Sequence, residues 1–278
     1  MRKSFLIVTI LLAATAAFAQ NPPDVHAGHQ MPATAPANPA VAEWAKQRLA
    51  ASPRHREWVK VKSDNREVNA FVVYPEVKSK ATSVVVIHEI FGMSDWVQLV
   101  SDEVAEAGYI AIAPDLLSGV GPLTDATAVG KAIRDLPPDQ ITADLNAVAD
   151  YVAKLPAANG RVAVAGFCWG GGQAFRFATN RPTLAAAFVF YGPGPDSVDA
   201  IKAPVYGFYA GNDARIGATV AKTLEMMHNG KKTYEVVTYE GAGHGFMRAG
   251  DAPDASEANK KARDESWARW KTLLKNLK

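Results

Sequence analysis

A single cysteine stands where the surrounding sequence would expose a nucleophile. Cys168 is the only cysteine in the chain and lies at the centre of the segment 166–171, GFCWGG. Residues 161–165 before it are apolar and predict a buried strand, and residues 172–178 after it predict a helix. Glycines beside a nucleophile at such a turn allow close backbone approach and leave the side chain above the sheet, as in a nucleophile elbow. The alternative is a small buried hydrophobe, the usual role of a free cysteine, but the strand–turn–helix setting favours the nucleophile.

One of the two histidines that follow Cys168 is placed to act as a general base. His244 lies in the glycine-rich loop 241–246, after a predicted strand that ends at Tyr239, so we expect its imidazole at the rim of the sheet. His228 ends a predicted helix and is interpreted as an ordinary residue of a helix C-terminus. The alternative for His244 is a solvated histidine in a glycine-rich turn.

An acid that could orient the base lies between the nucleophile and the histidine. Asp213 follows the predicted strand 205–209, at the edge where open α/β sheets build their sites. Its alternative role is to cap the helix that begins near Ile216. Because Cys168, Asp213 and His244 occur in the order nucleophile, acid, base, each after a predicted strand, the sequence predicts a catalytic triad.

Attack on a carbonyl also requires two backbone donors for the developing oxyanion. One donor is expected to be the amide of Trp169, the residue after the nucleophile. The other is expected in the loop 88–92, which follows the buried β-branched strand 83–87, and we assign it to the amide of Ile90.

The elements that must position these residues alternate between strands and helices. Such alternation predicts an α/β fold with a mostly parallel central sheet and helices on both faces, the first two strands being paired around the turn 63–65. The expected strands are 57–61, 68–74, 83–87, 109–113, 161–165, 184–190, 205–209 and 234–239, and the expected helices are 41–49, 94–107, 139–155, 172–178, 216–229 and 256–277.

Five segments in order along the chain resemble the signature segments of the dienelactone hydrolase family. The similarity extends from about Arg56 to the C-terminus. The resemblance implies an α/β-hydrolase fold, a triad of Cys168, Asp213 and His244, and hydrolysis of a lactone or carboxylic ester without metal or organic cofactor, through an acyl-cysteine intermediate. The five segments are 88–92 (HEIFG), 113–116 (APDL), 166–171 (GFCWGG), 212–213 (ND) and 244–246 (HGF).

The resemblance also implies residues that tune the thiol and bind the substrate. Glu89 matches a glutamate that contacts the thiol before substrate arrives, and we interpret it as a carboxylate that keeps the thiol neutral; its alternative is a hydrogen bond within the loop. Arg248 matches one of two arginines that bind a substrate carboxylate, and its alternative is a solvent-exposed ion pair at the rim. The second arginine would fall within 118–138, where Lys131 and Arg134 occur and no motif decides between them.

The N-terminus has the pattern of a secretory signal peptide. A basic start, an apolar run of residues 5–19 and a small-x-small ending predict a signal peptide over 1–19, with export to the periplasm or the medium. Residues 20–40 are rich in proline and alanine and predict a disordered linker, in which two histidines and a methionine are interpreted as spacers and not as a metal site. Residues 41–278 are expected to form a single domain.

Charge and cysteine content restrict the classes of partner. Loss of Arg2 and Lys3 with the signal peptide takes the formal net charge from +2 to 0, which argues against nucleic acid or an anionic membrane as partner. The apolar run is short for a membrane span, so we expect no stable membrane anchor. A lone cysteine has no intramolecular disulfide partner. We expect a monomer, and the resemblance implies that its partner is a small ester or lactone, with Arg248 available for a substrate that carries a carboxylate.

Other functions remain open for the same residues. An acyltransferase or a thiol peptidase would use the same acyl-cysteine, and nothing in the sequence separates these from a hydrolase. A non-catalytic binding protein on the hydrolase fold is a further alternative. The complete set of triad residues argues against this last reading.

Overall fold

A computed structural model describes residues 42–121, 123 and 125–277 of the chain, all within one compact unit. The predicted signal peptide over 1–19, the linker over 20–40 with its two histidines, and the first residue of the predicted domain lie outside the described residues. No helix in the described ranges is long and apolar enough to cross a membrane.

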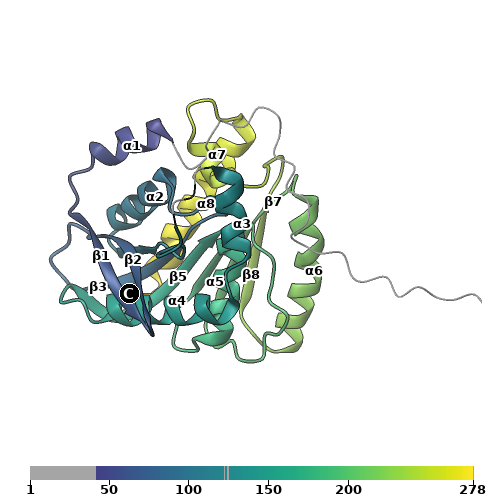
Figure 1. Ribbon diagram of the computed structural model, residues 1–278. Helices are drawn as coiled ribbons and strands as arrows, with labels where there is room; N and C mark the ends of the chain where they lie inside the picture. The colour runs from purple at the N-terminus through teal and green to yellow at the C-terminus, as the bar shows by residue number, and fades with distance from the viewer. Residues whose placement is uncertain (1–41, 122, 124, 278) are drawn as a thin grey trace, which may run out of the picture. The chain divides into compact units, whose positions relative to one another are not determined.

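The centre of the described unit is an eight-stranded sheet with the strand order β1-β2-β4-β3-β5-β6-β7-β8 (Figure 1). The first two strands form an antiparallel hairpin, β2 pairs antiparallel with β4, and all the remaining pairs are parallel, which confirms the predicted mostly parallel sheet. The strands are β1 (Arg56–Ser63), β2 (Arg66–Val73), β3 (Ala81–Ile87), β4 (Ile110–Pro114), β5 (Ala158–Phe167), β6 (Ala187–Phe190), β7 (Val205–Ala210) and β8 (Tyr234–Tyr239).

The helices cover both faces of this sheet, as predicted. Packing of the helices against the strands creates two apolar cores, one on each face. The helices are α1 (Glu43–Ala50), α2 (Asp95–Glu106), α3 (Ala126–Arg134), α4 (Pro138–Ala153), α5 (Trp169–Asn180), α6 (Ala214–Asn229), α7 (Phe246–Asp251) and α8 (Glu257–Lys275).

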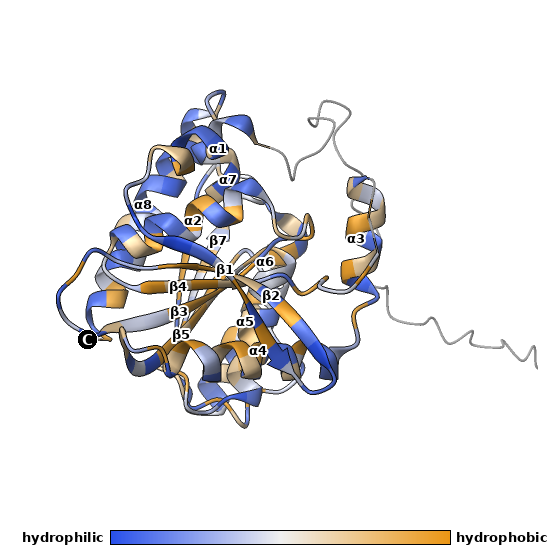
Figure 2. Cartoon of the chain, turned by 60° about the vertical axis from the view of Figure 1, so that its left-hand side comes forward, coloured by the Kyte–Doolittle hydropathy of each residue, from blue (hydrophilic) through white to orange (hydrophobic). Residues whose placement is uncertain are grey.

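Strand β3 shows why the middle of the sheet is buried. All seven of its residues are buried, and successive side chains enter opposite cores. Val85 and Ile87 contribute to the core under α4 and α5, whereas Val84 and Val86 contribute to the core under α2 and α8. A β-branched run without alternation is the pattern expected of a parallel strand covered on both sides, and Figure 2 shows the apolar colouring concentrated on these central strands.

The sequence analysis missed two short helices and overextended one strand. Helix α3 begins after Asp125, whose side chain accepts a hydrogen bond from the Ala128 amide, and α7 has only six residues. The six residues of α7 contain too few turns for a clear apolar period. Strand β6 begins at Ala187 and not at 184, because its ladders to β5 and β7 both begin at that residue.

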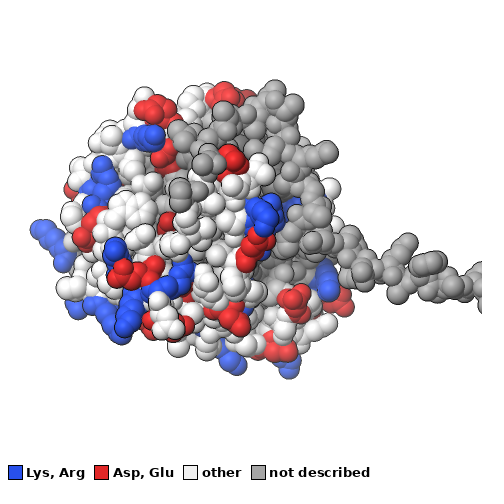
Figure 3. Space-filling view, viewed as in Figure 1, with Lys and Arg blue, Asp and Glu red and all other residues white. Residues whose placement is uncertain are grey.

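Charged side chains of both signs are interspersed over the face seen in Figure 3. A cluster of ion pairs joins α1, α2, α7 and α8. Arg48 of α1 and Arg263 of α8 both form ion pairs with Glu103 of α2 and with Asp251, the last residue of α7. The indole nitrogen of Trp96 also donates a hydrogen bond to Asp251, with an N–O distance of 3.0 Å. These contacts anchor the end of the short helix that follows His244.

Candidate active site

The backbone at Cys168 forms the tight turn that the sequence predicts between β5 and α5. Cys168 has φ 56° and ψ −117°, a conformation that residues other than glycine rarely adopt. Hydrogen bonds hold it there: the Cys168 amide donates to the Phe190 carbonyl at 3.0 Å, and the Cys168 carbonyl accepts from the Gly171 amide at 3.0 Å. A non-glycine residue maintained in such a conformation indicates a functional constraint on the turn.

Glycines are required around this turn because backbones from three elements meet there. A Cβ on Gly166 would overlap the carbonyl oxygen of Gly170. A Cβ on Gly170 would lie 2.5 Å from the carbonyl oxygen of Ile87 and closer still to that of His88, so the start of α5 packs directly on the end of β3. The glycine spacing that identified the elbow in the sequence therefore has a steric cause.

Substitution of Gly170 by alanine tests this close packing. We expect Gly170→Ala to lower the free energy of unfolding by about 1–3 kcal/mol, the usual cost of overpacking. Gly217→Ala in α6 is the matched control: a Cβ there meets no atom within 4 Å, so we expect equal or slightly greater stability. Chemical denaturation of both variants provides the measurement, and equal stabilities would contradict the packing described.

Three residues from the ends of three strands form a continuous hydrogen-bonded chain. Cys168 follows β5, Asp213 follows β7 and His244 follows β8. The Nε2 atom of His244 lies 3.0 Å from Sγ of Cys168, and Nδ1 lies 2.5 Å from Oδ2 of Asp213. The Asp213 Oδ1 atom also accepts a hydrogen bond from the Ile216 amide at 3.2 Å, so this aspartate orients the imidazole and caps α6 at the same time.

The surroundings of His244 in the hydrogen-bonded triad favour its positively charged form. Burial lowers the pKa of His244, but the hydrogen bonds and charges of Asp213 and Cys168 outweigh it and raise the pKa to about 10. Burial likewise raises the pKa of Asp213, but His244, the Ile216 amide and Arg215 outweigh it and hold that pKa below its ordinary value. An imidazolium beside a thiol favours the thiolate, which is the nucleophilic form.

The structure brings the predicted residues Glu89 and Arg248 together. Glu89 follows β3 and is buried, and its Oε2 accepts a hydrogen bond from Nε of Arg248 at 2.8 Å in an ion pair. The Arg248 guanidinium lies over the Phe91 ring, 4.9 Å from the ring centroid. Both residues lie near Gly245, because a Cβ there would be 3.8 Å from Glu89 Oε1 and 3.9 Å from an Arg248 nitrogen. The pair therefore lies beside the loop that carries His244.

The two predicted oxyanion donors lie on the segment after β3 and at the start of α5, which pack against each other at Gly170. Trp169 is the first residue of α5, where a backbone amide has no intrahelical acceptor, and Ile90 lies in the turn after β3. Among the described residues, neither amide donates a hydrogen bond to another protein atom. Both amides therefore lack a protein acceptor within the described part of the chain, and their assignment as oxyanion donors stays a prediction.

The structure separates the two candidates for a second basic residue. Lys131 is exposed and forms an ion pair with Asp135 one turn along α3. A guanidinium nitrogen of Arg134 and the Ile90 side chain both lie beside Gly130, at 3.4 Å and 3.5 Å from a Cβ placed there. Arg134 is therefore the candidate that lies near Ile90 in the loop 88–92.

Sequence reasoning missed two buried rings at this site. The Tyr191 ring lies edge-on to His244, with centroids 5.1 Å apart, and Tyr191 adopts φ 41° at the end of β6. The ring of His88 stacks on Trp169, with centroids 5.5 Å apart. The only available signals were their positions directly after predicted strands.

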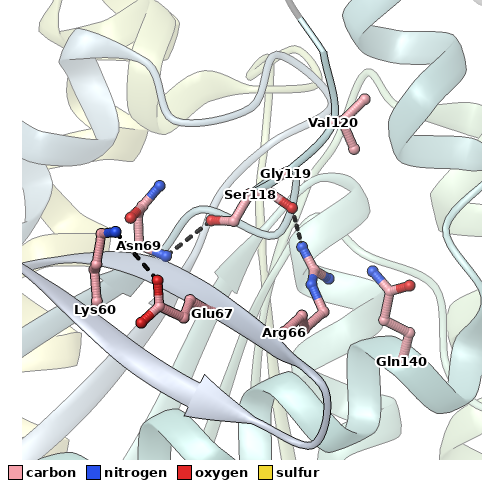
Figure 4. A pocket seen from close by; sticks show the side chains of 8 residues that line it. All are labelled: Lys60, Arg66, Glu67, Asn69, Ser118, Gly119, Val120 and Gln140. Atoms are coloured by element: carbon pink, nitrogen blue, oxygen red, sulfur yellow. Dashed lines mark hydrogen bonds and ion pairs between the residues drawn. The ribbon is translucent and has the colours of Figure 1, made fainter.

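A cavity of about 550 Å³ lies away from the triad, between the β1–β2 hairpin and the segment after β4 (Figure 4). Its two cationic groups are already paired, Arg66 with Asp144 at 2.7 Å and Lys60 with Glu67 at 3.1 Å. Arg66 also donates a hydrogen bond to the Ser118 carbonyl, and this bond attaches the segment after β4 to the β1–β2 hairpin.

In the ranges that the structure describes, no group of three or more His, Cys, Asp or Glu side chains is arranged to hold a metal ion.

A mostly parallel sheet with an elbow after β5, an acid after β7 and a histidine after β8 defines the α/β-hydrolase class. The model of the dienelactone hydrolase family matches residues 68–278. The chain belongs to this family, which confirms the resemblance seen in the sequence.

Individual relatives agree with this assignment. A provisionally named carboxymethylenebutenolidase of Saccharolobus solfataricus is 29% identical over 77% of this chain and 96% of its own length. A provisionally named carboxymethylenebutenolidase of Salmonella typhi is 30% identical over 75% of this chain and 83% of its own length. The crystal structure of a provisionally named dienelactone hydrolase from Klebsiella pneumoniae superposes with a TM-score of 0.70, at 26% identity, over 80% of this chain and 98% of its own. The chain is thus a hydrolase of a family that acts on small molecules.

Proposed function

We propose that this protein hydrolyses a carboxylic ester or lactone through an acyl-cysteine intermediate on Cys168. The observation that carries the proposal is the 3.0 Å contact between Cys168 Sγ and His244 Nε2 at a strained elbow, with His244 in turn bonded to Asp213. A nucleophile, a base within hydrogen-bond reach and an acid that orients the base make up the machinery for acyl transfer.

The chemistry follows from this geometry. The Cys168 thiolate attacks the substrate carbonyl carbon, and the amides of Ile90 and Trp169 donate to the oxyanion that forms. When the tetrahedral intermediate collapses, the C–O bond to the leaving group breaks and protonated His244 gives its proton to the leaving oxygen. Water then attacks the thioester while His244 takes a proton from it, and the C–S bond breaks to release the acid and restore the thiolate. Asp213 keeps the imidazole in the required tautomer throughout.

Turnover of two substrates by the purified protein tests this proposal. Hydrolysis of p-nitrophenyl acetate and of a dienelactone, each absent in Cys168→Ala, would support both the triad and the family's substrate class. Turnover of the activated ester alone would keep the hydrolase and reject the dienelactone. Absence of Cys168-dependent turnover of either would contradict the proposal.

We also infer that Arg248 binds a carboxylate of the substrate and that Glu89 is paired with Arg248 before the substrate binds. The Arg248 side chain is largely buried and has one acidic partner among the described residues, Glu89. A substrate carboxylate would compete with Glu89 for the guanidinium, and this would free the Glu89 carboxylate beside the thiol site. The raised pKa of Arg248, whose largest favourable cause is the Glu89 charge acting against burial, keeps the guanidinium charged.

Replacement of Arg248 tests the carboxylate site. We expect Arg248→Met to raise KM about tenfold to a hundredfold for an ester that carries a carboxylate, because a charge-assisted hydrogen bond contributes roughly 1.5–3 kcal/mol. For a neutral ester of the same acyl group we expect little change. Steady-state kinetics on this pair of substrates provides the measurement. An equal effect on both would indicate a packing role for Arg248 alone.

We further propose that the protein is exported. The support is the signal-peptide pattern of residues 1–19, which lie outside the described residues. Intact mass of the protein from fractionated producing cells should correspond to a chain that begins at Gln20. A full-length chain retained in the cytoplasmic fraction would contradict export.

A further inference from the structure

The fully buried ring of His88 packs the loop 88–92, which carries the proposed donor Ile90, against Trp169 at the start of α5. His88 follows β3 and directly precedes Glu89 and Ile90, and its ring packs against Trp169 from the start of α5. It belongs to neither the triad nor the substrate site described above. Its contacts explain what holds the oxyanion donors in place.

The first contact fixes the peptide that contains the Ile90 amide. The Nδ1 atom of His88 lies 2.8 Å from the carbonyl oxygen of Glu89. A carbonyl oxygen only accepts, so Nδ1 carries the proton and donates it. The Glu89 carbonyl and the Ile90 amide belong to one planar peptide unit. A donor on that oxygen therefore fixes the direction of the Ile90 N–H and polarises it. The Gly92 amide donates to the same oxygen at 3.2 Å.

The second contact places the other donor. The rings of His88 and Trp169 stack at 5.5 Å with an interplanar angle of 13°. The backbones also touch, because a Cβ on Gly170 would overlap the His88 carbonyl oxygen. Trp169 is thus held against β3 by its ring and by its neighbour's backbone. The same histidine therefore contacts both sides of the proposed oxyanion site.

The state of the ring fits a positioning role. Burial lowers the pKa of His88, so the imidazole is neutral at physiological pH. Its Nε2 atom has no hydrogen-bond partner among the described residues. A neutral ring with one proton, on Nδ1, makes a directional hydrogen bond to the Glu89 carbonyl and adds no charge next to Trp169.

We propose that His88 is a positioning residue that aligns both oxyanion donors, the Ile90 amide through the Glu89 carbonyl and the Trp169 amide through ring stacking. This inference rests on the proposed function, because it assumes that the two amides bind an oxyanion. His88 acts through the backbone and touches no reacting atom. Its loss should slow every step that develops an oxyanion and leave the thiolate–imidazolium pair unchanged.

A matched pair of variants separates the hydrogen bond from packing. Leu and Asn have nearly the same shape, but Asn retains a donor close to the position of Nδ1. We expect His88→Leu to lower kcat for ester hydrolysis about tenfold to a hundredfold at nearly constant KM, somewhat less than the roughly 10²–10³-fold cost of removing an oxyanion donor outright. We expect His88→Asn to recover most of that loss.

A second reaction of the same thiol provides the control. Iodoacetamide alkylates Cys168 by displacement of iodide at a saturated carbon, so no oxyanion develops. The rate of alkylation and its pH profile should be the same in wild type, His88→Leu and His88→Asn. The same selective loss is expected for Trp169→Ala, which retains the amide but lacks the stacking ring, and Trp169→Phe, which retains an aromatic ring, should lose less than Trp169→Ala. The Trp169 pair provides the test if both His88 variants fail to fold.

Each outcome bears on the proposal. Selective loss of hydrolysis with normal alkylation, rescued by Asn, supports it. Unchanged hydrolysis in His88→Leu, equal losses in Leu and Asn, or parallel losses of hydrolysis and alkylation would each overturn it. If wild type alkylates at Cys168 but shows no Cys168-dependent hydrolysis, the proposed function itself fails, and that result is visible before any His88 variant is made.

Discussion

Replacing Cys168 by alanine is expected to lower kcat/KM for ester hydrolysis by about 10⁴-fold or more, because the variant has no group to form the acyl intermediate. The fold should survive, because the side chain that is removed is small and the backbone strain at residue 168 is about the same for alanine as for cysteine. Residual hydrolysis should reflect only substrate binding and the oxyanion amides. Initial rates with p-nitrophenyl acetate, combined with thermal unfolding, provide the measurement.

Cys168→Ser supplies the matched control for this expectation. Serine retains the shape and can accept the hydrogen bond from His244, but a hydroxyl is far harder to ionise than a thiol. We therefore expect activity above that of Cys168→Ala and well below that of wild type. Wild-type activity in Cys168→Ala, with a normal unfolding temperature, would remove Cys168 from the mechanism.

Asp213→Asn is expected to produce the second large effect, a loss in kcat/KM of about 10²–10⁴-fold, because the imidazole loses the partner that sets its tautomer and stabilises its charge. The pH profile should change as well. Hydrogen bonds to Asp213 and Cys168 oppose burial and raise the pKa of His244 to about 10, so the alkaline limb of wild type should lie near that value. Loss of the carboxylate should move this limb to lower pH. Measurement of kcat/KM between pH 6 and 11 tests both statements.

The free energy of unfolding should also fall at alkaline pH. Because the pKa of His244 is raised in the folded state from 6.5 to about 10, the folded protein holds a proton that the unfolded chain releases. This contribution to stability is complete below about pH 6.5 and is lost as the pH rises through about 10.

Asp150→Asn, on the surface of α4, is the matched control for Asp213→Asn and should leave the alkaline limb of the kcat/KM profile in place. An unshifted limb in Asp213→Asn would contradict the role given to Asp213.

The parts of this protein that were predictable from the sequence are those with local signals. The glycine spacing around Cys168 has a steric cause within a few residues, and the β-branched run of β3 directly reflects burial on both faces. The side chains of Cys168, Asp213 and His244 meet because parallel strands place their C-terminal ends at one edge of the sheet. The two alternative roles of Asp213 turned out to be compatible, since its two oxygens serve one each.

The parts that were not predictable depend on pairs distant in sequence. Glu89 and Arg248 are 159 positions apart in the sequence, and no local pattern predicts that their side chains form an ion pair. The contact of His88 with Trp169 likewise requires that β3 and the start of α5 meet. Helix α7 was not predictable because six residues give too little periodicity, whereas α3, with nine residues and an aspartate at its N-cap, did carry a local signal.

Trapping of the acyl intermediate would show whether Cys168 carries the acyl group. The protein should be mixed with a slight excess of p-nitrophenyl acetate, quenched in acid within the first turnover, and analysed by intact mass and peptide mapping. We expect one acetyl group per chain, located on Cys168, that forms as p-nitrophenolate is released and then decays at a rate consistent with kcat. Turnover without acetylation of Cys168, or a stable acetyl group on another residue, would contradict this expectation.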